Sequence, residues 1–371
     1  MRIFFVFSLM MFAAVTKAQS YRLLVGTYTN GGGSKGIYVY DFNAATGEAK
    51  WLSNTNGDVS NPSYLAVSTN GKYVYAVNEN GGNKPGEVSA FSFNKKSGEL
   101  LFINKQSSGG DHPCYVTLTK NGKWAIVGNY SGGNFSVFPV KPDGSLEPYK
   151  QLIQHSGSSV NEQRQKKPHV HATVLSQKED YLFVPDLGID KVMIYPFNTA
   201  KQTPLDTTKP SFAAAAPGNG PRHFEIHPGG KYAYLMEELS GTVAVYQYHK
   251  GQLKFIQRIS SHPEDYKGSI GSADIHVSPD GKFLYASNRG DANTLAIFSI
   301  GADGKLTSKG FQSVMGSSPR NFMIDSTGKY LLVANQNSNN IVVFKRDKTT
   351  GLLTETTQIQ VPNPVCLKMV K

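Results

Sequence analysis

Short apolar strands recur in pairs along the chain, and a polar turn that usually contains Gly-Lys separates the two members of a pair. The copies begin at Pro62, Pro113, Pro168, Pro221, Ser272 and Pro319, with a last half-copy at Pro364. These starts are 51, 55, 53, 51, 47 and 45 residues apart. A period near fifty residues in a chain of alternating strands is typical of the blades of a β-propeller.

The segment 113–157 shows the pattern of one blade. Alternating apolar residues predict strands over 114–119, 124–128 and 134–140, and a fourth strand from Leu146. An Asn-Gly pair lies between the first two strands, where a tight hairpin turn needs it. We therefore expect four short antiparallel strands in each blade.

The two ends of the chain complete each other. The pattern predicts three strands near the N-terminus, over Leu23–Val25, Ile37–Tyr40 and Lys50–Leu52, and none of them is a first strand. Residues 364–371 supply a first strand without the other three. Pairing of Val365 to Val370 beside Leu23 to Thr27 would complete a seventh blade. We thus predict an all-β fold, a single seven-bladed β-propeller domain over residues 19–371.

The first eighteen residues have the features of a signal peptide. Arg2 is followed by an apolar run from Ile3 to Val15, which is too short to span a bilayer, and Thr16 to Ala18 supply small residues for cleavage after Ala18. We therefore expect a protein that is exported to the periplasm or secreted, with no membrane span after cleavage.

The formal charge of +11 is carried mainly by lysines that are scattered over turns. Nucleic-acid binding needs a clustered basic face, so we do not expect it. Long-range attraction would still favour anionic substrates.

Cys114 and Cys366 lie in blades that are not neighbours, so we interpret them as buried apolar residues rather than a disulfide. We predict no metal, no cofactor and a monomer.

Propeller geometry predicts where chemistry can occur. The first strand of each blade lines the central channel, and the second strand returns to the face where the first one starts. Blade starts and second-strand ends therefore meet at one mouth of the channel. The residues at blade starts are Ser63, Cys114, His169, His171, Arg222, His223, Asp274 and Arg320. Those at second-strand ends include Thr27, Glu79, Tyr130, Asp186, Glu237, Glu238, Asn288, Arg289 and Asn335.

Imidazole and charged groups concentrate in the three blades that start at Pro168, Pro221 and Ser272. His169 and His171 should point the same way along a strand, and other blades have apolar residues at the position of His171. Each residue also has a structural interpretation. A buried histidine can simply be hydrogen-bonded, and Arg222 with Glu238 can be a structural ion pair. The convergence of these groups on adjacent blades favours a functional site.

Two further segments bear on mechanism. The run Gln163 to Lys167 is either a solvated loop or a cover over the mouth, because it leads directly to His169. No Gly-x-Ser-x-Gly elbow accompanies a strand-to-helix turn, so a covalent acyl-enzyme is disfavoured.

The chain resembles the seven-bladed propeller lactonases, the group with propeller-type 6-phosphogluconolactonases and fungal carboxymuconate cyclases. The motifs that carry this resemblance are Pro168 to Ala172, Gly220 to His223, Tyr232 to Leu239, Ser272 to His276 and Ala286 to Arg289. It implies an active site at the channel mouth formed by His171 (or His169), Glu238, Arg222 and Arg289. The second carboxylate, Glu237, is a departure from the Asn-Glu-Leu that the family often has there.

The resemblance implies a lactone hydrolase of the 6-phosphogluconolactonase type, which would open a sugar lactone by general acid–base catalysis at the channel mouth. His171 or Glu238 would activate water, and Arg222 and Arg289 would hold an anionic group or the oxyanion. Further candidates for contact with the substrate are His169, His223, Glu237, Asn288 and Arg320. Two alternatives remain: a muconate-type lactonizing cycloisomerase and a non-catalytic propeller that binds a ligand at the same mouth.

Overall fold

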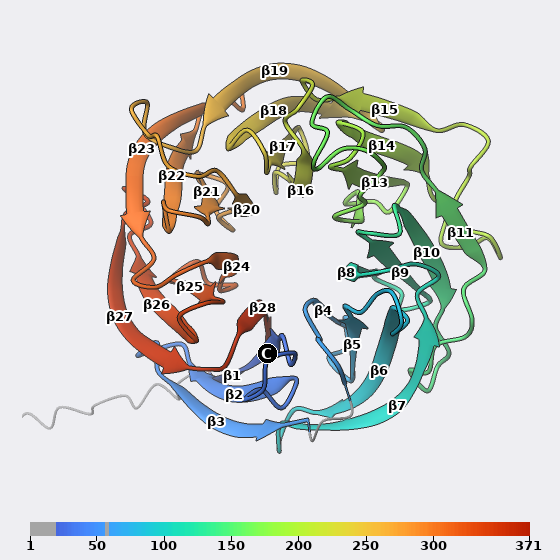
Figure 1. The fold of residues 1–371 in the computed structure, drawn as a ribbon. Coiled ribbons are helices and arrows are strands. Elements are labelled where there is room, and N and C mark those ends of the chain that lie inside the picture. The colour runs from blue at the N-terminus through green and yellow to red at the C-terminus, as the bar shows by residue number, and fades with distance from the viewer. Residues whose placement is uncertain (1–19, 56–58) are drawn as a thin grey trace, which may run out of the picture.

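Seven four-stranded antiparallel sheets form a closed ring around a central channel (Figure 1). The structure, a computed structural model, describes residues 20–55 and 59–371, and within these ranges it contains strands and no helix. The predicted seven-bladed propeller is therefore confirmed. The predicted signal peptide lies outside the described residues. In the ranges that are described, no helical segment could cross a membrane.

Each blade runs from an innermost strand at the channel to an outermost strand at the rim. Blade 1 comprises β4 (Leu65–Val67), β5 (Tyr73–Asn78), β6 (Glu87–Asn94) and β7 (Glu99–Ser107). Blade 2 comprises β8 (Pro113–Leu118), β9 (Trp124–Asn129), β10 (Asn134–Pro139) and β11 (Gln151–Gln154). Blade 3 comprises β12 (Val174–Leu175), β13 (Tyr181–Asp186), β14 (Lys191–Pro196) and β15 (Ser211–Ala214).

The same order continues around the ring. Blade 4 comprises β16 (Pro221–Ile226), β17 (Tyr232–Glu237), β18 (Thr242–His249) and β19 (Gln252–Ser260). Blade 5 comprises β20 (Ser272–Val277), β21 (Phe283–Asn288), β22 (Thr294–Ile300) and β23 (Leu306–Ser313). Blade 6 comprises β24 (Pro319–Ile324), β25 (Tyr330–Asn335), β26 (Asn340–Arg346) and β27 (Leu353–Gln360). Blade 7 comprises β28 (Pro364–Val370), β1 (Ser20–Thr27), β2 (Tyr38–Asn43) and β3 (Ala49–Asn54).

Blade 7 closes the ring with strands from both ends of the chain. β28 pairs antiparallel with β1, from Arg22 opposite Val370 to Thr27 opposite Pro364. This pairing confirms the predicted closure. Val365, Cys366 and Leu367 of β28 are almost fully buried. Closure places every blade between two neighbours, so both faces of each sheet are covered, and the remaining sheet edges face only the channel and the rim.

The hydrophobic core is divided into layers between adjacent blades. The second strand of a blade is buried on both of its faces, as in β9, where all six residues are buried. Between blades 1 and 2, for example, Phe91 and Val77 pack in one cluster with Val127 and Phe138. Polar side chains on the inner strands can therefore reach solvent only at the channel and its two mouths.

The innermost strands of blades 1 and 3 are shorter than the repeat predicts. β12 begins at Val174 rather than near Pro168, and only a single bridge, Val170 opposite Asp186, precedes it. The backbone N–H of His171 donates to the carbonyl oxygen of Pro185 (3.1 Å), but Pro185 has no N–H with which to continue the ladder. The break leaves His169 and His171 on an irregular segment at the mouth.

A polar network joins the innermost strands of four adjacent blades along the channel wall. Asp274 of β20 accepts hydrogen bonds from the Nδ1 of His223 on β16 (2.7 Å) and from the side chain of Asn321 on β24. The Asn321 oxygen in turn accepts from the backbone N–H of Leu367 on β28 (2.7 Å). Buried polar groups with every partner in place specify a single arrangement. The network holds the channel wall under the mouth in a fixed position.

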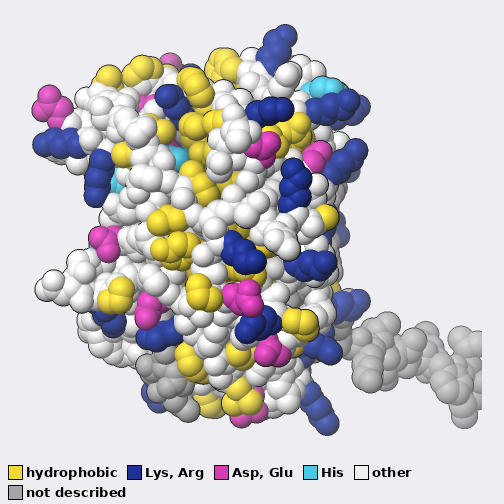
Figure 2. All heavy atoms as spheres, turned by 90° about the vertical axis from the view of Figure 1, so that its right-hand side faces the viewer, with side chains coloured by type: hydrophobic (Ala, Val, Ile, Leu, Met, Phe, Trp, Pro, Cys, Tyr) yellow, Lys and Arg dark blue, Asp and Glu magenta, His cyan; other side chains and the backbone are white. Residues whose placement is uncertain are grey.

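On the face shown in Figure 2, lysine and arginine lie among acidic and apolar side chains without gathering into one patch. The two cysteines are free and buried, as expected.

Candidate active site at the channel mouth

Glu238 is the centre of a charged cluster at one mouth of the channel. It directly follows β17, and its backbone N–H donates to the carbonyl oxygen of Gly220 (2.8 Å), which fixes the turn. One carboxylate oxygen accepts from the Nε of Arg222 (2.9 Å) and lies 3.3 Å from an Nη of Arg289. The other oxygen accepts from an Nη of Arg164 (2.8 Å). Three guanidinium groups from three segments thus converge on one carboxylate.

His171 lies beside this carboxylate. Its Nε2 is 4.0 Å from Glu238, and its Nδ1 is 3.8 Å from the Sγ of Cys114. Burial, together with the positive charge of Arg222, lowers the pKa of His171 well below its usual value, so the ring is neutral at neutral pH. A carboxylate only accepts hydrogen bonds. The arrangement therefore favours the tautomer with its proton on Nε2, facing Glu238, and with the thiol donating to Nδ1.

A second cluster of polar and charged side chains, Tyr28, Glu79 and Arg320, lines the mouth on the side of blades 1, 6 and 7. The hydroxyl of Tyr28 donates to Glu79 (2.8 Å), and an Nη of Arg320 lies 3.7 Å from the same carboxylate. The guanidinium of Arg320 also lies over the Tyr28 ring, 5.5 Å from its centre. Arg320 is thereby held between an aromatic face and a carboxylate, with its charge directed at the channel.

These groups enclose a small cavity of about 190 Å³. Its lining consists of Tyr28, Glu79, Cys114, Tyr130, Arg164, His171, Glu238, Arg289 and Arg320. Together with Arg222 behind Glu238, four guanidinium groups face two carboxylates, so the cluster has two more positive than negative charges. A pocket of this charge attracts an anion, and its fixed donors suit an oxyanion that develops during a reaction.

The arginines determine the protonation state of Glu238. Burial alone would raise the pKa of its carboxyl group, but the charges of Arg289, Arg222 and Arg164 outweigh burial and lower the pKa to about 2. Burial lowers the pKa of Arg289 to about 10, against the opposing effect of Glu238. At neutral pH the cluster therefore holds an ionised carboxylate, charged guanidinium groups and a neutral imidazole.

The structure brings most of the predicted catalytic residues together. His171, Glu238 and Arg289 face the cavity, and Arg320, a predicted substrate contact, lines it as well. Arg222 lies behind them. Its side chain is almost fully buried, and it donates to Glu238 and to the carbonyl oxygen of Ala273. It is placed to orient Glu238 rather than to meet a ligand.

Four other predicted contact residues lie outside the cavity. Glu237 points away into blade 4, where Arg258 of β19 donates to it from Nε (2.7 Å) and Nη2 (3.0 Å). Asn288 is buried and bonded to Ser261 and Ser272. Successive strand residues point to opposite faces, which explains why Glu237 and Glu238 diverge.

The other two of these four residues are histidines that lie beside and below the cavity. His169 stacks on Tyr130 with 4.5 Å between ring centres, and its Nδ1 donates to the Tyr130 carbonyl oxygen (3.0 Å). His223 lies below the cavity, where it binds Asp274, and burial lowers its pKa to about 4. Its ring contacts that of His171, with 5.4 Å between centres.

Sequence reasoning gave no role to several residues that line the cavity. Glu79, Tyr130 and Cys114 were placed at the mouth by the repeat geometry alone, and Tyr28 directly follows such a position. Arg164 belongs to the loop for which a solvated role and a covering role were both open. The structure shows it over the mouth, with an Nη also bonded to the Tyr130 hydroxyl (3.0 Å).

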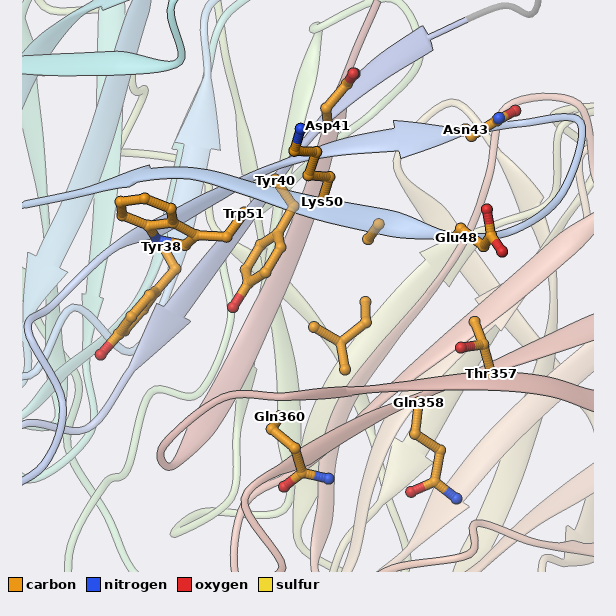
Figure 3. Close-up of a pocket in the computed structure, with 12 residues that line it drawn as sticks. Tyr38, Tyr40, Asp41, Asn43, Glu48, Lys50, Trp51, Thr357, Gln358 and Gln360 are labelled. Atoms are coloured by element: carbon orange, nitrogen blue, oxygen red, sulfur yellow. The ribbon is translucent and has the colours of Figure 1, made fainter.

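A larger cavity of about 870 Å³ lies at the rim of the ring, between β2 and β3 of blade 7 and β27 of blade 6 (Figure 3). Trp51 and Tyr38 lie at one end, and Gln358 and Gln360 line the opposite wall. Its polar groups have partners of ordinary structural kinds, such as Asp41 with Arg22 and Gln358 with Asn340. The rim cavity lacks the buried, converging charges of the channel mouth. The channel mouth is therefore the candidate active site.

Comparison with known proteins finds relatives whose names agree with one another, since each is named as a lactonase. A protein of Formosa agariphila named 6-phosphogluconolactonase is 40% identical over 343 residues, 92% of this chain and 97% of the relative. The 6-phosphogluconolactonase of Bacillus subtilis is 38% identical over 352 residues, with 93% and 97% covered. The structure of the periplasmic gluconolactonase of Pseudomonas aeruginosa superimposes with a TM-score of 0.89 at 38% identity, over 95% of this chain and 99% of that one.

The family model described as "Lactonase, 7-bladed beta-propeller" matches residues 22–369, which is nearly all of the chain that the structure describes. The match includes every blade and all the residues of the mouth cluster. The chain therefore belongs to the seven-bladed β-propeller lactonase family.

Proposed function

We propose that this protein is a lactone hydrolase that acts on a sugar lactone at the channel mouth. The observation that carries this proposal is the ionised carboxylate of Glu238, surrounded by guanidinium groups and a neutral imidazole in one cavity. Lactone hydrolysis needs a base for water, donors for the oxyanion and an acid for the leaving oxygen. The mouth supplies each of these.

In the proposed mechanism Glu238 accepts a proton as water attacks the lactone carbonyl carbon. The negative charge that develops on the carbonyl oxygen is stabilised by Arg289 and by the N–H of the neutral His171 ring. When the ring C–O bond breaks, the carboxylic acid of Glu238 returns the proton to the leaving oxygen. The product is a hydroxy acid, whose carboxyl group then loses a proton to solvent.

Arg222 positions Glu238 in this scheme. It is buried, it donates to the backbone of blade 5, and its Nε fixes one carboxylate oxygen. Arg289 has a different role because it also lines the cavity, where a substrate oxygen can reach it. Both remain charged at neutral pH.

The choice of substrate follows from charge and from the named relatives. Relatives are named for 6-phosphogluconolactone and for gluconolactone. The positive excess at the mouth supports a lactone that carries, or develops, negative charge. A sugar lactone of six carbons, with or without a phosphate, is the substrate class that we propose.

The test is a substrate screen with purified protein lacking residues 1–18. Acid release should be measured in a pH-stat with glucono-lactone, 6-phosphogluconolactone and muconolactone, with the uncatalysed rate subtracted. We expect hydrolysis of at least one of the two sugar lactones. Conversion of muconolactone alone would favour the cycloisomerase, and binding without turnover of any lactone would favour a non-catalytic propeller.

The pH dependence of kcat/KM provides a further prediction. The base must be deprotonated, and the pKa of Glu238 is about 2, while that of His171 is also well below its usual value. Arg289 must be charged, and it loses its proton only near its pKa of about 10. With glucono-lactone, which has no group that titrates in this range, we therefore expect a constant kcat/KM from about pH 5 to about pH 9, measured from initial rates in buffers of constant ionic strength. An acid limb near the ordinary histidine pKa would contradict this assignment.

We also propose export, on the basis of the N-terminal sequence and the similarity to a periplasmic relative. N-terminal sequencing of protein recovered from the periplasm or medium should then begin at Gln19. A full-length protein in the cytoplasm would refute export.

A further inference from the structure

The loop between β11 and β12 places one arginine over the mouth. Its base is anchored by Gln165, whose buried side chain donates to the carbonyl oxygen of Leu187 (2.8 Å) and accepts from the backbone N–H of Asn161 (3.1 Å). Lys167 donates to the carbonyl oxygen of Ser131 (2.8 Å). Arg164 directly precedes these anchors, and its backbone N–H donates to the carbonyl oxygen (3.2 Å) and to the Oδ1 (3.0 Å) of Asn161, so its backbone is held while its side chain lines the cavity.

Arg164 differs from the other three arginines of the cluster. Its side chain is 43% exposed, compared with 1% for Arg222, 19% for Arg289 and 16% for Arg320. Arg222 and Arg289 donate to backbone carbonyl oxygens, which fix them to the channel wall. Among the residues that the structure describes, the Arg164 side chain donates hydrogen bonds only to the side chains of Glu238 and Tyr130, and both bonds come from one terminal nitrogen.

The remaining donors of Arg164 are available to a ligand. Among the described residues, no protein acceptor binds its Nε or its other Nη. An anion that approaches the mouth from solvent meets this guanidinium first. The cavity of about 190 Å³ is also small for a six-carbon lactone, since ligand pockets usually reach about 300 Å³ or more. Outward movement of the Arg164 side chain would enlarge it.

We propose that Arg164 is the specificity-determining residue of this site: it binds an anionic group of the substrate distal to the lactone ring and thereby releases one oxygen of Glu238 for the attacking water. The inference rests on the proposed lactone hydrolysis. The anionic group is a phosphate or a carboxylate, because the guanidinium fork matches both.

This change of partner, in which Arg164 leaves Glu238 and binds the substrate anion, would couple substrate recognition to catalysis. In the free protein both oxygens of Glu238 accept from guanidinium groups, which makes the carboxylate a weak base. When Arg164 turns to the substrate anion, Glu238 loses one of its three cationic partners. Its affinity for a proton rises, and the released oxygen faces the cavity. A neutral lactone cannot draw Arg164 away, so it would be hydrolysed by a less reactive site.

The test compares Arg164→Gln with Lys166→Gln, a matched control that removes an exposed positive charge two residues away in the same loop. kcat/KM is measured for glucono-lactone, for 6-phosphogluconolactone and for glucarolactone, which carries a carboxylate in place of the phosphate. In Arg164→Gln the preference for the anionic lactones over the neutral one should fall about ten- to hundredfold, as expected for a lost hydrogen bond to a charged group. Lys166→Gln should keep the wild-type preference. The two anionic lactones show whether phosphate or carboxylate is the better partner.

A second readout separates recognition from structural support. With glucarolactone, whose carboxylate titrates at lower pH than a phosphate, the acid limb of kcat should lie at higher pH than that of kcat/KM in the wild type, and this difference should disappear in Arg164→Gln. Equal losses on neutral and anionic lactones would overturn the proposal, since Arg164 would then only support Glu238.

Binding measurements distinguish failure of this inference from failure of the proposed function. By calorimetry, the wild type should bind 6-phosphogluconate more tightly than gluconate, and Arg164→Gln should lose that difference. If no lactone is hydrolysed but this pattern is found, lactone hydrolysis is wrong and anion recognition by Arg164 stands. If the wild type binds both acids equally, the inference is wrong even when lactones are hydrolysed.

Discussion

Replacement of Glu238 by glutamine should lower kcat for the preferred lactone by about 10²- to 10⁴-fold, the contribution of a positioned general base. The amide has the shape of the carboxylate and can still accept from Arg222, but it cannot take a proton from water. Steady-state kinetics on the purified variant measure the effect, and circular dichroism establishes that the strands are intact. A kcat within a few-fold of the wild type would exclude Glu238 as the base.

The adjacent carboxylate provides the control. Glu237→Gln removes the same charge one residue earlier, in a side chain that faces Arg258 and not the cavity. This variant should lose stability because the Arg258 guanidinium is left without its partner. Its kcat should stay close to that of the wild type at a temperature where it is folded. A loss of turnover equal to that of Glu238→Gln would mean that general electrostatics, and not a positioned base, explains both results.

Removal of residues 364–371 should abolish cooperative unfolding. β28 is the innermost strand of blade 7, and its loss would expose β1 along the channel and remove the buried side chains of Val365, Cys366 and Leu367. Burial of Val365 and of Leu367 contributes about 1.5–3 kcal/mol each, which together is a large part of the whole stability of a typical domain, about 5–15 kcal/mol.

Thermal and denaturant unfolding measure this loss. The matched control removes only the exposed Lys371, which should leave the midpoint nearly unchanged. A sharp transition at the wild-type midpoint in the protein lacking 364–371 would show that the ring does not depend on its closing strand.

The fold could be predicted from the sequence because similar strand patterns and turn residues recur from blade to blade. A turn glycine such as Gly122 lies nine residues after the start of five of the seven blades. The unmatched strands at the two ends of the chain pair with each other in a shared blade. The interruption of β12 was not predicted, because it depends on Pro185, a residue of the partner strand.

The candidate site was predicted only in part, for a related reason. Strand ends place Glu238, Arg289 and Arg320 at one mouth, and the irregular start of blade 3 places His171 there, so the repeat of blades brings them together. Asn288 and Glu237 occupy equally suitable positions in the sequence, yet their side chains turn to partners within the blades. Arg164 lies on an irregular loop whose path follows from Gln165 and Lys167, and no periodic pattern describes such anchors.

The most direct test of the proposed site is a crystal structure of Glu238→Gln soaked with the lactone that the wild type hydrolyses fastest. The slow variant should retain the lactone, or its ring-opened acid, in the cavity at the channel mouth. The reacting carboxyl carbon should then face residue 238, and its oxygen should lie within hydrogen-bond distance of Arg289 or His171. Ligand found only in the rim cavity between β3 and β27, with the mouth unoccupied, would contradict catalysis at the channel mouth.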